Sequence, residues 1–129
     1  MLDGVTRHPP DYRPYTCHSL AHAVHPNSAA YLSRDRILVT LFHLHSLGCI
    51  DRTTGALTIL IRSLSSPHAV RPARNVPAHS PVAFSVANTR GQQIVLLDHE
   101  AAEISRVHIR CNWIQVCLLL RSYALVGNI

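Results

Sequence analysis

The residues with the clearest capacity for chemistry are histidines near the N-terminus. His18, His22 and His25 follow Cys17 at spacings that would place the imidazoles along one side of a helix. Imidazole nitrogen is a preferred ligand of Zn²⁺. However, the chain contains ten histidines and lacks the Cys-x-x-Cys and His-Glu-x-x-His patterns of established zinc sites. We therefore expect no cofactor in the leading interpretation, and we keep zinc binding by His18, His22 and His25 as an alternative.

Two further segments contain histidines that could take part in chemistry. His43 and His45 lie two positions apart in an apolar stretch, so in a strand both would point to the same face. Asp98, His99 and Glu100 combine groups used in acid–base catalysis, but the chain lacks a nucleophile in a defined catalytic context. We predict a surface acidic turn at 98–100 and a protein that is not an enzyme.

Arginine supplies a second kind of chemistry. All twelve cationic residues other than histidine are arginine, and the formal net charge is +5. Guanidinium groups bind carboxylates and phosphates through paired hydrogen bonds. Arg106, His108 and Arg110 alternate with apolar residues, which predicts a strand with one basic face.

The arginines are unevenly distributed along the chain. Residues 52–97 contain five arginines and no acidic residue. A positive field of this kind attracts acidic peptides, phosphate or membrane headgroups. We predict an accessory protein that binds a protein partner or an anionic surface, and electrostatic RNA binding is an alternative. The predicted binding residues are Arg71, Arg74, Arg90, Arg106, His108 and Arg110.

Two clusters of proline divide the chain into the segments that must position these residues. Prolines occur up to residue 26 and again between 67 and 81, with none in 27–66 or 82–129. Because proline lacks an amide donor and favours extended geometry before it, these clusters indicate irregular segments. We predict a Pro/His-rich arm over 1–26 and a single β-rich domain over 27–129, with a linker or long loop at 65–81.

The predicted fold class is mainly β or α+β, with a small antiparallel sheet. One hairpin joins 37–50 to 56–64 through the turn 51–55, although 56–64 could be a buried helix. A second hairpin joins 82–87 to 92–97 through 88–91. The basic strand follows at 106–113, and 116–126 could form another. Helical structure is expected only at 17–24 and as one turn over 99–105. No internal repeat is evident. The predicted interior contains Val82, Phe84, Val86, Val107, Ile109 and Trp113.

The remaining apolar residues and the cysteines bear on location and assembly. The run Ile114–Leu120 is too short to cross a bilayer, so we expect a soluble chain without a transmembrane segment. The apolar side chains of this run must be buried against other protein, and a second copy of the chain in a homodimer could bury them. The four cysteines are expected as free thiols in an intracellular compartment, cytoplasmic or nuclear.

The order of several segments resembles that of a phosphotyrosine-binding domain. These segments are Leu41–Ser46, Thr54-Gly55, Val82–Val86, Ile94–Asp98 and Arg106–Cys111. The resemblance implies a pleckstrin-homology-like sandwich that takes an extended peptide beside one strand. That family's C-terminal helix, which borders the peptide groove, has no counterpart in this sequence, so the implied alternative is a truncated peptide-binding module without assigned binding residues.

Overall fold

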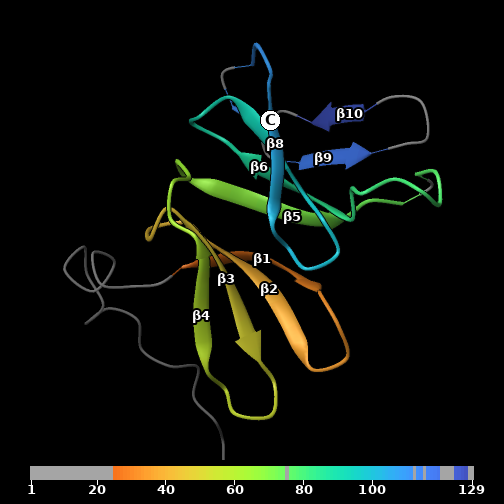
Figure 1. The fold of residues 1–129 in the computed structure, drawn as a ribbon. Coiled ribbons are helices and arrows are strands. Elements are labelled where there is room, and N and C mark those ends of the chain that lie inside the picture. Colours follow the sequence, from red (N-terminus) through yellow and green to blue (C-terminus); the bar gives the residue numbers. More distant parts are fainter. Residues whose placement is uncertain (1–24, 75, 112, 115, 120–123, 128–129) are drawn as a thin grey trace, which may run out of the picture.

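The computed structural model describes residues 25–74, 76–111, 113–114, 116–119 and 124–127. Within these residues the chain is all-β and contains no helix (Figure 1). The strands are β1 (Pro26–Tyr31), β2 (Arg36–Leu41), β3 (Ser46–Asp51), β4 (Leu57–Ile61), β5 (Pro67–Pro72), β6 (Phe84–Asn88), β7 (Gln93–Leu97), β8 (Glu103–His108), β9 (Val116–Leu119) and β10 (Ala124–Gly127).

The strands form two four-stranded antiparallel sheets and one strand pair. Sheet A has the order β1-β2-β3-β4, and sheet B has the order β5-β6-β7-β8. Each strand therefore pairs with the strand that precedes or follows it in the sequence. β9 and β10 pair with each other, and β9 packs against β5 and β6 of sheet B (Figure 1).

The hairpin predicted over 82–97 is confirmed by β6 and β7, whose turn lies at residues 89–92. The turn predicted at 51–55 is also confirmed, because it joins β3 to β4. The prediction of one strand over 37–50 was wrong. This stretch forms two paired strands, since residues 42–45 make a turn in which His45 adopts a φ of 50°. His43 and His45 consequently lie in a turn and not on a strand face.

Three other segments differ from the sequence expectation. The helical turn expected over 99–105 was wrong, because 103–105 belong to β8. β8 ends at His108, so Arg110 and Trp113 lie beyond the strand in which they were predicted. The stretch 65–81 contains β5 in its first half, and only 73–83 forms the loop that joins β5 to β6. The helix predicted at 17–24 lies outside the described residues.

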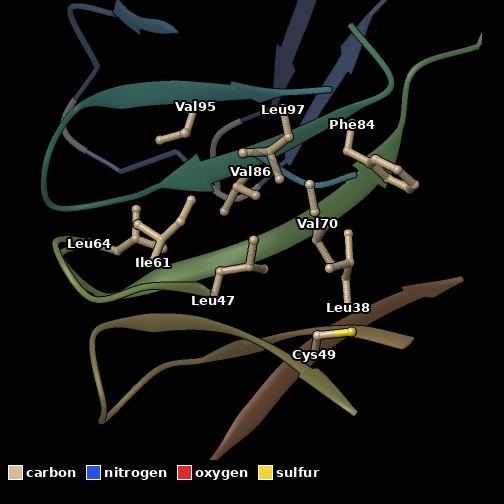
Figure 2. Close-up of a cluster of buried hydrophobic side chains, with 11 residues drawn as sticks. Leu38, Leu47, Cys49, Ile61, Leu64, Val70, Phe84, Val86, Val95 and Leu97 are labelled. Carbon is tan, nitrogen blue, oxygen red and sulfur yellow. The ribbon is translucent and has the colours of Figure 1, made fainter. Parts of the chain in front are cut away.

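The main core lies between the two sheets. Leu38 and Leu47 of sheet A pack against Val70, Val86 and Leu97 of sheet B, and each of the five is fully buried (Figure 2). A smaller cluster on the far side of sheet B joins strands β5, β6 and β7 to the segment before β9; its buried members are Ala69, Ala87, Ile94 and Ile114. The two sheets thus stack face to face, and the far side of sheet B meets further apolar chain.

The predicted interior is correct in the centre of sheet B and wrong at its last strand. Phe84 and Val86 are buried, whereas Val82, Ile109 and Trp113 are half-buried. Val107 was predicted to be interior but has an exposed fraction of 45%. The alternation of polar and apolar residues in 106–113 is real, but β8 is the last strand of its sheet and its apolar side chains are only partly covered.

The two sheets are related by an internal repeat that the sequence alone does not reveal. In the β3–β4 turn, the Asp51 carboxylate accepts hydrogen bonds from the backbone N–H groups of Thr53 and Thr54, and Gly55 has a φ of 74°. In the β7–β8 turn, which is one residue shorter, the Asp98 carboxylate accepts hydrogen bonds from the backbone N–H groups of Glu100 and Ala102, and Ala101 has a φ of 63°. Both turns therefore use an aspartate and a left-handed residue.

The repeat has a constant offset through the middle strands of the sheets. His45 and Gln92 both have positive φ values, of 50° and 52°. The backbone N–H of each donates a hydrogen bond to the carbonyl of the residue three positions earlier, which is Phe42 for His45 and Thr89 for Gln92. Residue 45 corresponds to residue 92 and residue 51 to residue 98, so the offset is 47 residues in both places. Sheet B is thus a second copy of the unit that forms sheet A, with a longer first loop at 73–83.

Candidate functional site

The acidic residues gather at one end of the stacked sheets. Every acidic residue that the structure describes lies in the β1–β2, β3–β4 or β7–β8 connection or at a strand end beside one. Within each sheet, alternate connections lie at the same end because the strands alternate in direction. β1 and β5 run side by side in the same direction, so the two sheets contribute to the same end. We call this the acidic end; its carboxylates are Asp35, Asp51, Asp98, Glu100 and Glu103.

The carboxylates at the acidic end are largely engaged in local structure. The pKa of Asp51 is lowered, chiefly by the hydrogen bond that its carboxylate accepts from the Thr53 hydroxyl. Glu100 pairs with Arg36 at 3.3 Å and thereby links sheet B to sheet A. Together with the Asp98 turn, these contacts identify 98–100 as a surface acidic turn, as the sequence predicts.

The opposite end of the sheets carries no acidic residue among those described. It is formed by the segments 42–45, 62–66, 89–92 and 108–111. Three backbone hydrogen bonds hold these segments together, from Leu64 N–H to the His45 carbonyl, from Arg90 N–H to the Ser65 carbonyl and from Ile109 N–H to the Gln92 carbonyl. We call this the basic end; its exposed cationic residues are Arg62, Arg90 and Arg110, accompanied by His43, His45 and His108.

A row of aromatic rings lies beside these arginine-bearing segments. The ring of His68 is 5.3 Å from that of Phe42 and 5.4 Å from that of Trp113, measured between centroids. His25 continues the row, since its Nδ1 lies 3.1 Å from Nε2 of His43. These residues come from the start of β1, the β2–β3 turn, β5 and the segment before β9, so the row connects both sheets at the basic end.

His68 is the most constrained imidazole of the row. Its Nε2 is buried and has no hydrogen-bond partner among the described residues, whereas its Nδ1 lies 3.4 Å from the Asn27 amide nitrogen. The pKa of His68 is lowered from the ordinary value of 6.5 by burial, and repulsion from His25 lowers it further. The folded protein therefore favours neutral His68.

This shift makes the stability of the fold depend on pH. The unfolded chain protonates His68 as the pH falls through about 6.5, while the folded chain resists protonation, so acidification favours the unfolded state. We expect the free energy of unfolding at pH 5.5 to be lower than at pH 7.5, by more in the natural chain than in His68→Gln. Urea titrations of both proteins at the two pH values measure the difference. An equal loss in the two proteins would contradict the assignment to His68.

The structure brings some of the predicted binding residues together and separates others. Arg90, His108 and Arg110 lie at the basic end and are exposed. Arg71 and Arg74 lie in the second half of β5 and in the loop after it, towards the acidic end. The six predicted residues therefore do not form one surface. Arg62 belongs with the first group but was not singled out, although it falls in the acid-free stretch 52–97.

Arg106, which the sequence predicts as a binding residue, is engaged in contacts within the fold. Its guanidinium forms two hydrogen bonds with the Glu103 carboxylate, at 2.7 and 2.9 Å, and two with Ser63, to the carbonyl at 3.0 Å and to the hydroxyl at 2.7 Å. Consequently the pKa of Glu103 is lowered by the hydrogen bond from Arg106. Ser63 follows sheet A, so Arg106 joins the two sheets.

The predicted zinc site falls mostly outside the described residues. His18 and His22 are not among them, and His25 faces His43 at the end of the aromatic row. The described residues hold no group of three or more histidine, cysteine, aspartate or glutamate side chains placed to bind a metal ion. Of the four cysteines expected as free thiols, Cys49 and Cys111 are described, and neither forms a disulfide with another described residue.

Comparisons with known proteins give no match. No protein-family profile matches the chain, no curated protein matches its sequence, and no solved structure matches its fold. The resemblance to a phosphotyrosine-binding domain therefore gains no support. In the described residues, no helix is long and apolar enough to cross a membrane.

Proposed function

We propose that this chain is a non-enzymatic binding protein whose basic end binds an acidic segment of a protein partner. The observation that carries the proposal is the uneven balance of charge: the described carboxylates share the acidic end with Arg34, Arg36 and Arg52, whereas Arg62, Arg90 and Arg110 lie exposed at the basic end, which has no described carboxylate. Such an imbalance orients an approaching acidic ligand and speeds its encounter with the binding surface.

The residue types at the basic end suit carboxylates. Arg62, Arg90 and Arg110 can each offer paired N–H donors to a carboxylate, and none of the three guanidinium groups has a hydrogen-bond partner among the described residues. All three lie on turns or segments between strands, where binding residues are commonly held by a rigid scaffold. The half-buried Trp113 adds apolar contact area beside them.

The proposal predicts a position-specific effect of charge reversal. Arg90→Glu with Arg110→Glu should weaken binding of a fluorescent glutamate-rich peptide about tenfold or more, which corresponds to about 1.4 kcal/mol. Arg34→Glu with Arg74→Glu is the matched control, because it makes the same change in net charge with exposed residues towards the acidic end. Fluorescence anisotropy across a salt series measures both. Equal weakening by the two double variants would show that only net charge matters and would overturn the proposal.

The same variants test the alternatives. RNA binding would appear as tighter retention of a single-stranded RNA oligonucleotide than of the peptide, with a steep dependence on salt. A zinc-binding function would depend on His18, His22 and His25, none of which is among the arginines of the proposed function. The free thiols of Cys49 and Cys111 support an intracellular location, which remains part of the proposal.

A further inference from the structure

Two imidazoles of the aromatic row face each other at the basic end. Nδ1 of His25 lies 3.1 Å from Nε2 of His43, and the two ring centroids are 4.9 Å apart. His25 stands just before β1, and His43 lies in the β2–β3 turn, 18 positions later in the chain. Both residues are exposed, so an ion from solvent can reach the two nitrogens.

The backbone around the two histidines holds their rings in place. His25 has a φ of 43°, a left-handed conformation that residues other than glycine adopt only where the surrounding structure enforces it. Its carbonyl accepts a hydrogen bond from the Phe42 N–H at 3.1 Å, which ties the start of β1 to the β2–β3 turn. The Phe42 ring contacts both imidazoles, with centroids 5.5 Å from His25 and 5.2 Å from His43. The fold therefore positions the pair before any ligand arrives.

The separation of the two nitrogens suits a divalent metal ion that prefers imidazole. Zn²⁺ binds histidine nitrogen at about 2.0–2.1 Å in tetrahedral geometry, so two nitrogens bound to one ion lie about 3.3 Å apart. The observed 3.1 Å is close to this separation. When both nitrogens face an ion, each ring carries its proton on its other nitrogen, so two neutral imidazoles bind without losing a proton.

We propose that His25 and His43 together bind one Zn²⁺ ion, with water in the remaining coordination positions. In the part of the chain that the structure describes, no third histidine, cysteine, aspartate or glutamate is placed to complete the site. His68, the next imidazole in the row, has a buried Nε2 and an Nδ1 that lies beside Asn27, so it is not a ligand. The bound ion would link the start of β1 to the β2–β3 turn.

The proposed site differs from the zinc site that the sequence predicts. The predicted site uses His18, His22 and His25, which lie close together in the chain. The proposed site uses two residues that are 18 positions apart and meet because β1 pairs with β2. Its geometry therefore depends on the fold, whereas neither His18 nor His22 is required.

The zinc affinity of the full chain and of two double variants tests the proposal. Loss of a group that only supports a metal ligand weakens metal binding about 10–100-fold, so loss of both ligands should weaken it at least about tenfold. We expect this loss for His25→Ala with His43→Ala, measured by isothermal titration calorimetry with Zn²⁺. His18→Ala with His22→Ala is the matched control, because it removes the same number of histidines and should leave the affinity nearly unchanged.

Two results would contradict the proposal. One is a natural chain that binds no Zn²⁺, and the other is a control variant that loses as much affinity as His25→Ala with His43→Ala. Side-chain ¹⁵N NMR spectra give a second readout, in which the ring nitrogens of His25 and His43 should shift together as zinc is added. Shifts confined to other histidines would also contradict it. Circular dichroism checks that the double variant is folded; if it is not, His43→Ala alone replaces it, because His43 lies exposed in a turn.

This inference is independent of the proposed function, because neither histidine is among the arginines that bind the acidic segment. Glutamate-peptide affinity measured with a metal chelator present should be the same for the natural chain and for His25→Ala with His43→Ala. A chain that binds the peptide but no zinc would overturn this inference alone, and a chain that binds zinc but no peptide would overturn the proposed function alone.

Discussion

Replacing Leu38 with alanine should lower the free energy of unfolding by about 2–5 kcal/mol, because it leaves a cavity in the centre of the interface between the sheets. Leu38 is fully buried and points from β2 towards Val70 and Phe84 of sheet B (Figure 2). Residues of both sheets lose contacts with the Leu38 side chain. Filling the cavity would require one sheet to move relative to the other.

Urea unfolding followed by the fluorescence of Trp113, the only tryptophan of the chain, measures this effect. Leu44→Ala is the matched control, because Leu44 lies in the β2–β3 turn with an exposed fraction of 48%. The control should change the free energy of unfolding by roughly 0.5 kcal/mol or less. Similar losses for the two variants would mean that the sheets are not packed as described.

Asn88→Ala should be the second strongly destabilising change, by about 1–3 kcal/mol, because it removes a buried side chain and leaves the half-buried Ser65 N–H without its partner. The Asn88 side-chain oxygen accepts a hydrogen bond from Ser65 N–H at 2.6 Å, and its amide donates to Gln93 Oε1 at 2.9 Å. Asn88 thereby ties sheet B to the segment that leaves sheet A. Chemical denaturation of the purified variant gives the loss.

Gly91 supplies a sharper form of the same prediction. A Cβ at position 91 would lie 2.3 Å from Nδ2 of Asn88, so Gly91→Ala should displace the Asn88 amide and destabilise the natural chain. In the Asn88→Ala background this clash is absent and Gly91→Ala should cost little. A double-mutant cycle measures the coupling between the two sites. Additive losses would contradict the proposed contact.

The sequence predicts the centre of sheet B because its local signals agree. Phe84 and Val86 alternate with small residues, and Asn88 to Gly91 carry turn chemistry. Sheet A lacks such signals at its β2–β3 turn. Residues 42–45 contain neither glycine nor proline, and the left-handed position is filled by His45. The strands on either side are therefore read as one, because their continuous apolar residues show no alternation that would mark the reversal.

The repeat is hidden from the sequence for a related reason. The left-handed position of the aspartate turn is Gly55 in one unit and Ala101 in the other, so the residue that marks the turn is not shared. The first loops also differ in length, because β5 and β6 are joined by residues 73–83 and β1 and β2 by only a few residues. The two units share their backbone geometry, but different residue types occupy the left-handed positions. The repeat is therefore not visible as a repeated sequence.

The candidate site could be predicted only in part. The acid-free stretch 52–97 supplies Arg62 and Arg90 of the basic end, but it also supplies Arg52, Arg71 and Arg74, which lie towards the acidic end. The alternation at 106–110 predicts a basic row, but Arg106 is turned to Glu103 and Ser63, and Arg110 lies beyond the strand end. Arg62 follows β4 and lies at the basic end because sheet A contains four antiparallel strands. Reading β2 and β3 as one strand hides this position.

The pairing of neighbouring strands also has a consequence for how the chain folds. Within sheets A and B, each strand pairs only with strands that are its neighbours in the sequence. Most strand pairing therefore closes short loops, and the entropy cost of closing a short loop is small. All-β proteins usually fold slowly because their pairings are distant in sequence. The strand pairings of each sheet are therefore local, and the contacts most distant in sequence are those by which sheet A packs on sheet B.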